Sequence, residues 1–170
     1  QRYTTSGKEE KYIHPFENKS FSLVHNGVMP FYIEGEHSDT YVFFNKFLEG
    51  FNLSKHKQRE QKIISSIKSL IDNKDVGYYS IALFDKKTKR LYYFKNSSAL
   101  INAYIYNKES LFLSTKDISE LFNLYLPETK VLNIEDLKIY RIETKKEIKM
   151  SIIGLLEEIK KEINFNSTLG

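Results

Sequence analysis

The architecture of this chain follows from one segment, Gly77-Tyr78-Tyr79-Ser80-Ile81-Ala82-Leu83-Phe84-Asp85. Its residues are nearly all apolar on both alternating faces, which is typical of a central strand that is covered from both sides. Layers of other elements must therefore lie above and below this strand. A chain of 170 residues with 41% hydrophobic content is long enough to supply those layers within one domain.

Shorter strand-like segments follow the central strand. They are 91–94, 99–106, 111–114, 131–134 and 137–142. Most are joined by short loops, including a hairpin loop over 107–110, which favours antiparallel sheet with packed helices. Ser114 or Thr115 is expected to cap a short helix that runs through Phe122. A final amphipathic helix is predicted from the spacing of Ile152, Leu155, Leu156, Ile159 and Ile163.

One strand and two helices are expected before the central strand. The strand covers 21–25, and Asn26-Gly27 after it is suited to positive φ, which predicts a tight turn. Ser38 and Asp39 are good N-caps for a helix. The hydrophobic residues of that helix recur at helical spacing at Tyr41, Phe44, Leu48 and Phe51, and those of the second helix at Ile63, Ile64, Ile67, Leu70 and Ile71.

The charge pattern gives no indication of a nucleic-acid surface. The formal net charge is 26 − 22 = +4, and basic residues alternate with acidic ones along most of the chain. The densest basic run, Lys86-Lys87-Thr88-Lys89-Arg90, lies between two predicted strands. We interpret this run as a solvated hairpin loop, with a phosphate-contacting patch as the weaker alternative. We therefore expect no nucleic-acid partner.

The absence of cysteine excludes disulfides and thiolate metal sites within this sequence. There is no apolar run of membrane-spanning length and no apolar signal-peptide core, so a cytoplasmic protein without a membrane partner is expected. His14 and His25 each lack a second ligand at useful spacing, so they are expected to pack or orient rather than hold a metal. His37 and His56 are expected at the surface. No cofactor is predicted.

A string of small polar motifs occupies the first forty residues. They are Arg2, Thr5-Ser6-Gly7, His14-Pro15-Phe16, His25-Asn26-Gly27 and Ser38-Asp39-Thr40. Together they supply a cation, an amide next to a backbone N–H, and a carboxylate, which are the groups that a pocket for a free amino acid needs. Taken singly, each has a simpler explanation, because Asn-Gly is commonly a plain turn and Asp39 a plain helix cap.

The order and spacing of these motifs resemble the class II glutamine amidotransferases, which are N-terminal-nucleophile (Ntn) hydrolases. The similarity is greatest to the glucosamine-phosphate-synthase-like and stand-alone branch. The resemblance implies an α+β fold, a four-layer α/β/β/α sandwich of two antiparallel sheets whose first strands are missing here. It implies a partial amidotransferase domain over 1–142, followed by a C-terminal helix and tail over 143–170.

The resemblance also implies residue roles. Asn26 and Gly27 would stabilise the oxyanion of the tetrahedral intermediate. Arg2 would bind the α-carboxylate of glutamine, Asp39 its α-ammonium group, and Thr5 and Ser6 would line the same pocket. The family's nucleophile is an N-terminal cysteine, which we expect upstream of this chain, so the chain alone is not expected to hydrolyse glutamine.

Two further interpretations remain open at this stage. The chain is either the glutaminase domain of an enzyme whose partner is an acceptor or synthase domain or subunit, or a non-catalytic module that senses amino acids or binds a partner. A weaker third interpretation, nucleic-acid binding through the 86–90 loop and the lysine-rich C-terminal segment, predicts a steep dependence of affinity on salt.

Overall fold

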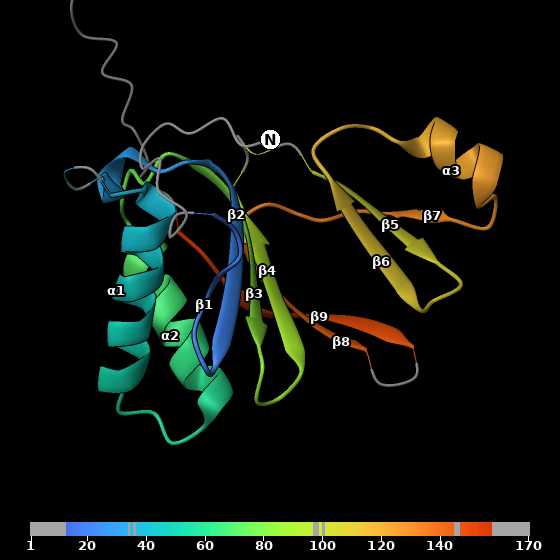
Figure 1. Cartoon of the computed structure of the whole chain (residues 1–170). Coiled ribbons are helices and arrows are strands. Elements are labelled where there is room, and N and C mark those ends of the chain that lie inside the picture. The colour runs from blue at the N-terminus through green and yellow to red at the C-terminus, as the bar shows by residue number, and fades with distance from the viewer. Residues whose placement is uncertain are drawn as a thin grey trace, which may run out of the picture.

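The computed structural model describes residues 13–33, 35, 37–96, 99, 101–144 and 147–157 (Figure 1). The strands in chain order are β1 (Phe16–Glu17), β2 (Phe21–Val28), β3 (Tyr78–Asp85), β4 (Arg90–Lys95), β5 (Asn102–Tyr106), β6 (Ser110–Ser114), β7 (Lys130–Leu132), β8 (Lys138–Thr144) and β9 (Ile148–Leu155). The helices are the 3₁₀ turn η2 (Pro30–Tyr32), α1 (Asp39–Leu53), α2 (Arg59–Ile71) and α3 (Ser119–Tyr125). None of the helices in these ranges is long and apolar enough to cross a bilayer.

Two antiparallel sheets organise these elements. One has six strands in the order β1-β2-β3-β4-β8-β9, and the other has three in the order β6-β5-β7. The predicted central strand is confirmed as β3, which pairs with β2 on one side and β4 on the other. The run 86–89 forms the β3–β4 turn, as predicted for a hairpin loop. The mixed α+β class with two antiparallel sheets is therefore confirmed.

The two faces of the six-stranded sheet contact different layers. Helices α1 and α2 cover one face (Figure 1), where Phe43 and Ile67 belong to the same buried cluster as Ile81 and Tyr92. The next residue after Tyr92 points the other way, because side chains alternate along a strand. That other face carries a second cluster, which joins Tyr93, Ala103, Ile134, Tyr140 and Ile142. The three-stranded sheet packs here.

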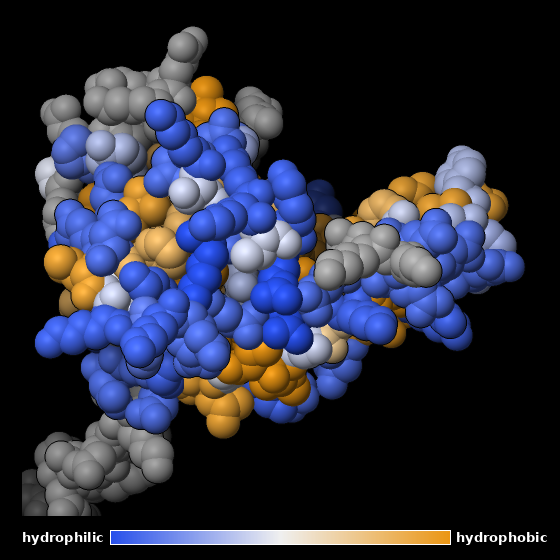
Figure 2. Space-filling view, turned by 90° about the horizontal axis from the view of Figure 1, so that it is seen from below, coloured by the Kyte–Doolittle hydropathy of each residue, from blue (hydrophilic) through white to orange (hydrophobic). Residues whose placement is uncertain are grey.

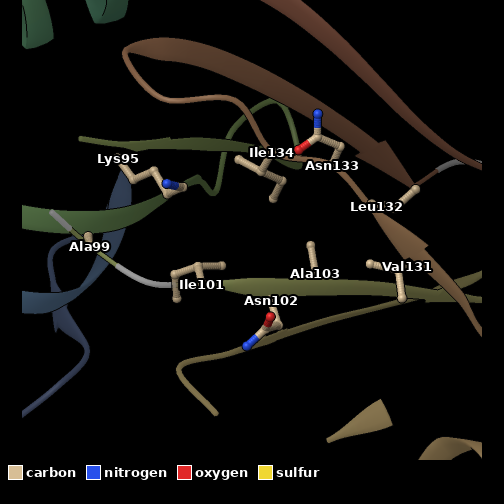
Figure 3. Close-up of a pocket in the computed structure, with 9 residues that line it drawn as sticks. All are labelled: Lys95, Ala99, Ile101, Asn102, Ala103, Val131, Leu132, Asn133 and Ile134. Carbon is tan, nitrogen blue, oxygen red and sulfur yellow. The ribbon is translucent and has the colours of Figure 1, made fainter. Parts of the chain in front are cut away.

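Helix α3 covers the far side of the three-stranded sheet. Ala103 of β5 faces the second cluster, whereas the adjacent Tyr104 contacts Phe122 of α3 edge to face, with ring centroids 4.9 Å apart. Phe112 of β6 also contacts Phe122. The helix begins at Ser119 rather than at the predicted Ser114 or Thr115. Between the two sheets lies a cavity of about 360 Å³ (Figure 3).

The prediction of a tight turn at Asn26-Gly27 is wrong. Strand β2 continues through both residues to Val28, with Asn26 opposite Ser80 and Gly27 opposite Tyr79. The positive φ expected for the glycine is present, at 143°, but it occurs inside the strand. Pairing with β3 along the whole strand therefore outweighs the local turn preference of the dipeptide.

The prediction of a final helix is also wrong over Ile148–Leu155, which form β9. This strand pairs antiparallel with β8, and Ile148 and Met150 contact the second cluster. A short apolar run fits helical and strand periods alike, and here the available edge of β8 decides the outcome. Ile159 and Ile163 lie outside the described residues, and the domain boundary at residue 142 stays a prediction.

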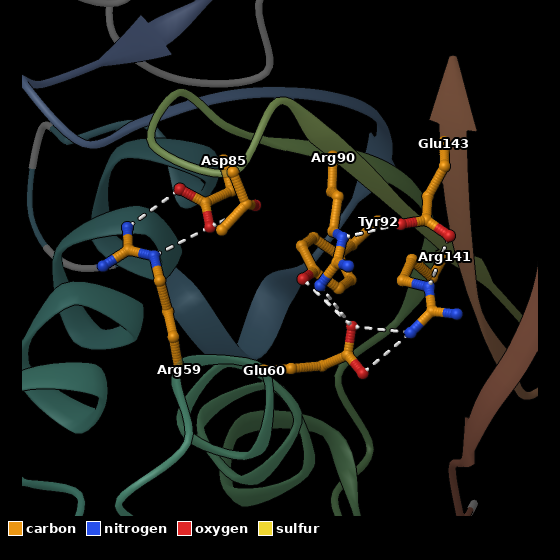
Figure 4. A network of polar contacts seen from close by, with 8 residues as sticks. Arg59, Glu60, Asp85, Arg90, Tyr92, Arg141 and Glu143 are labelled. Atoms are coloured by element: carbon orange, nitrogen blue, oxygen red, sulfur yellow. Dashed lines mark hydrogen bonds and ion pairs between the residues drawn. The ribbon is translucent and has the colours of Figure 1, made fainter. Parts of the chain in front are cut away.

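A network of ion pairs ties the start of α2 to the sheet (Figure 4). Arg59 donates from Nε and Nη2 to the buried carboxylate of Asp85, at 2.8 and 2.9 Å. The next residue, Glu60, accepts from Arg141 Nη1 at 3.1 Å and lies 3.6 Å from Arg90 Nη1. Figure 2 views the molecule from below, where β3 ends and α2 begins. The surface seen there is mainly hydrophilic, with separate hydrophobic areas. The network therefore joins α2 to β3, β4 and β8.

Asp85 makes the stability of the fold sensitive to acid. Burial raises the pKa of this carboxyl, but hydrogen bonds from Arg59, Thr88 and the Lys87 N–H outweigh burial and hold the pKa below its usual value. The stability that Asp85 contributes is fully present above the unfolded-state pKa of about 3.9 and is lost as pH falls through the lower folded-state pKa. We expect the free energy of unfolding to fall below about pH 4, and less so in Asp85→Asn. Urea unfolding across this range tests it, and equal acid sensitivity of both proteins would contradict it.

Candidate functional site

Three of the predicted site residues fall within the described part of the chain. They are Asn26, Gly27 and Asp39, and all three lie at or near the end of β2. Gly27 has a φ of 143°, a backbone conformation that side-chain-bearing residues rarely adopt. A Cβ at this position would lie 2.2 Å from the backbone oxygen of Tyr78 and 2.9 Å from Nε2 of His25. Only glycine fits here, so the backbone at this position carries no side chain that would block its approach to a ligand.

Asp39 connects the start of α1 to the end of β2. Its carboxylate is 3% exposed, and its Oδ2 accepts from the Met29 N–H at 2.8 Å. Its Oδ1 accepts from the N–H of Thr40 at 2.7 Å. The preceding Ser38 is the N-cap, as predicted, and its Oγ accepts from the Tyr41 N–H at 3.1 Å. The negative charge of Asp39 is thus held at a helix N-terminus, where the helix dipole favours it.

His25 links Asp39 to Gly27 through Thr40. The Thr40 hydroxyl donates to Asp39 Oδ1 at 3.2 Å, so it accepts the 2.8 Å hydrogen bond from His25 Nδ1. The proton on the ring is thereby assigned to Nδ1, and Nε2 lies on the side of Gly27. The packing or orienting role predicted for His25 stays a prediction, and the hydrogen bond to Thr40 is the contact that would orient its ring.

Asn26 lies on the other face of the same strand end. Its side chain is exposed, and strand alternation turns it away from His25, towards the face on which the second sheet packs. Asn26 is opposite Ser80 on β3, and Ser80 is opposite Lys95 on β4. These three residues therefore form a row across three strands.

The residues beside Asn26 are polar and largely buried. Ser80 Oγ lies 2.7 Å from the hydroxyl of Tyr93, and burial raises the pKa of Tyr93 to about 12, so its phenol stays protonated at neutral pH. Lys95 is 7% exposed and forms an ion pair with Asp136. Sequence reasoning missed Ser80, Tyr93 and Lys95. The only available signal was the two-residue spacing of Tyr93 and Lys95, because the row from Asn26 through Ser80 to Lys95 depends on strand register.

The predicted site is therefore described in part. Asn26, Gly27 and Asp39 lie at the same end of the six-stranded sheet, with Gly27 and Asp39 on one chain of contacts and the Asn26 side chain on the opposite face. Arg2, Thr5 and Ser6 lie outside the described residues. His37 and His56 are exposed, as predicted. Among the described residues, no group of three or more histidine, aspartate or glutamate side chains is placed to hold a metal ion.

Comparison with solved structures shows what class of protein shares this fold. The glutamine phosphoribosylpyrophosphate (PRPP) amidotransferase from B. subtilis, complexed with ADP and GMP, matches 89% of this chain with a TM-score of 0.58 and 15% identity. A structure described as the allosteric regulatory enzyme of purine biosynthesis matches 82% of the chain with a TM-score of 0.53 and 14% identity. The matches cover 33% and 30% of those chains.

These likenesses establish the fold. The described chain has the fold of a part of glutamine PRPP amidotransferase, and it spans about a third of the length of the structures that it matches. No family model matches the chain, and no curated protein matches it in sequence.

Proposed function

We propose that this chain is the glutamine-binding part of a class II glutamine amidotransferase of the Ntn type, in the glucosamine-phosphate-synthase-like or stand-alone branch. The observation that carries the proposal is the position of Asn26 and Gly27 at the end of β2, next to Met29, whose N–H donates to Asp39, within a fold shared with a glutamine PRPP amidotransferase. The sequence of packed faces, from α1 and α2 through two sheets to α3, supports the four-layer Ntn sandwich.

Each residue has a defined role in this proposal. The Asn26 amide and the Gly27 N–H stabilise the oxyanion that forms when the side-chain amide of glutamine is attacked. Arg2 binds the α-carboxylate, and Thr5 and Ser6 line the pocket. Asp39 binds the α-ammonium group. Asp39 Oδ1 already accepts from the N–H and the hydroxyl of Thr40, but Oδ2 accepts only from the Met29 N–H and can accept a further hydrogen bond.

The nucleophile must come from outside these 170 residues, because they contain no cysteine. In this proposal an N-terminal cysteine encoded upstream attacks the glutamine amide, and the ammonia passes to an acceptor or synthase domain or subunit. Release of glutamate and ammonia by the complete gene product tests this step. An intact, folded product that releases neither from glutamine would end the catalytic proposal.

Asp39→Asn is expected to weaken glutamine binding about ten- to a hundredfold. The substitution keeps an oxygen acceptor for the backbone but removes the charge that the α-ammonium group needs, and hydrogen bonds to charged groups contribute about 1.5 to 3 kcal/mol. Isothermal calorimetry with L-glutamine measures the change.

Ser38→Ala is the matched control for this substitution. It removes the N-cap hydrogen bond to Tyr41 and costs about 1 kcal/mol of stability, but it leaves the Asp39 carboxylate in place. We expect glutamine affinity to be unchanged. Equal losses of affinity in the two variants would show that Asp39 acts only through the helix start.

The absence of cysteine favours one second candidate, a non-catalytic Ntn-fold module for amino-acid sensing or partner binding. Such a sensor binds glutamine or glutamate, with affinity lost in Arg2→Ala and Asp39→Ala, and releases no ammonia in any form of the gene product. A scaffold that only binds a partner shows no amino-acid binding at all. The same calorimetry therefore separates these two from the enzyme.

A further inference from the structure

The cavity between the two sheets has a lining of mixed polar and apolar groups, with one charged residue. Ile101, just before β5, and Ala103 of β5 line it, together with Leu132 of β7, which pairs with Ala103, and Ile134 beyond β7. Its volume of about 360 Å³ lies near the lower end of the range for ligand pockets, about 300 to 1,000 Å³. The space therefore suits a small molecule that has both a polar and an apolar part.

Lys95 is the charged group of this cavity. Figure 3 shows its side chain directed towards the cavity, whereas the amides of Asn102 and Asn133 are turned away from it. An ammonium group has three N–H donors, and Asp136, which is 42% exposed at its side chain, engages one of them. The Lys95 side chain is only 9% exposed, and a buried charge is stabilised by anionic partners, so a second carboxylate beside it is favourable.

We propose that this cavity is a binding site for a small organic monocarboxylate. The carboxylate accepts a hydrogen bond from Lys95 Nζ, and the apolar body of the ligand lies against Ile101, the paired residues Ala103 and Leu132, and Ile134. The site is separate from the proposed glutamine contacts of Asp39, which lies on the helix-covered side of the six-stranded sheet. Lys95 also belongs to the row that begins at Asn26, so the two proposals are separated by Asp39→Asn, which leaves Lys95 in place.

The proposal predicts opposite changes of carboxylate affinity in two variants, one of Lys95 and one of Asp136. Lys95→Met keeps the apolar stem but removes the cation, so it weakens carboxylate binding at least tenfold. Asp136→Asn keeps a hydrogen-bond acceptor for Lys95 but removes the neighbouring negative charge, which repels the ligand. It therefore strengthens binding severalfold, an effect that loss of structure alone does not produce.

Calorimetry of the full chain with sodium hexanoate tests the proposal, with hexan-1-ol as the uncharged probe. We expect saturable binding of hexanoate, weaker binding of hexanol, and hexanoate-induced shifts in the amide NMR signals of residues 101–103 and 131–134. Ala103→Val, which fills the space but keeps Lys95, is expected to reduce binding of both probes.

Three results would overturn the proposal. They are hexanol binding as tight as that of hexanoate, hexanoate binding of Lys95→Met equal to that of the original chain, and the absence of hexanoate binding. If Lys95→Met does not fold, Asp136→Asn decides alone, and an unchanged or lower hexanoate affinity in that variant contradicts the site. Loss of glutamine binding in Asp39→Asn has no bearing on any of these outcomes.

Discussion

Gly27→Ala is expected to lower the free energy of unfolding by at least about 3 kcal/mol, or to prevent folding. Two costs add at this position. A non-glycine residue at a φ of 143° is strained, and the new Cβ would lie 2.2 Å from the backbone oxygen of Tyr78, which cannot move without breaking the β2–β3 pairing. Urea unfolding followed by circular dichroism measures the change.

Gly35→Ala separates the two costs. Gly35 also has a positive φ, of 57°, but a Cβ there would meet nothing within 4 Å. We expect this substitution to cost only the conformational strain, about 1 to 2 kcal/mol. If the two alanine substitutions destabilise the chain equally, the close approach of β2 to β3 at Gly27 does not constrain that residue.

Elements whose signals are local could be predicted from the sequence. Helix α1 begins after Ser38 because a serine N-cap precedes a hydrophobic helical repeat, and β3 was predicted because its residues are apolar on both faces. In each case the residues that form the element also carry the information. Neither prediction required knowledge of which other segments lie beside the element.

Elements that depend on a distant partner could not be predicted in this way. Asn26-Gly27 has the composition of a turn, but pairing with Tyr79 and Ser80 extends the strand through it. Residues 148–155 have an amphipathic pattern that also fits a helix, and only the neighbouring edge of β8 makes them a strand. The period of a short apolar run cannot decide between these alternatives.

The same distinction between local and long-range signals applies to the candidate site. The motif string located Asn26, Gly27 and Asp39, because helix capping and glycine conformation are local properties. The contact of Asp39 with the Met29 N–H and the row from Asn26 to Lys95 depend on packing and register between strands. Neither this packing nor this register could be predicted from the sequence pattern alone.

Asp85→Ala is expected to lower the free energy of unfolding by about 3 to 5 kcal/mol. Asp85 is fully buried and accepts two hydrogen bonds from Arg59, whose guanidinium lies 4.8 Å from the ring centroid of Phe21. Removing one partner of such a pair leaves the other charge uncompensated. The Lys87 N–H also loses its acceptor at 3.0 Å. Thermal and urea unfolding measure the loss.

Lys86→Ala is the control in the adjacent position. Lys86 pairs with Glu17 at 2.8 Å, but that pair is partly exposed, and exposed ion pairs contribute about 0 to 1 kcal/mol. Replacing both members of the buried pair, as in Arg59→Met with Asp85→Leu, should recover much of the stability lost in Asp85→Ala, because no unpaired charge remains. If Asp85→Ala costs no more than Lys86→Ala, the Arg59–Asp85 pair does not hold α2 against the sheet, and its attachment rests on the Glu60 ion pairs and its buried apolar residues.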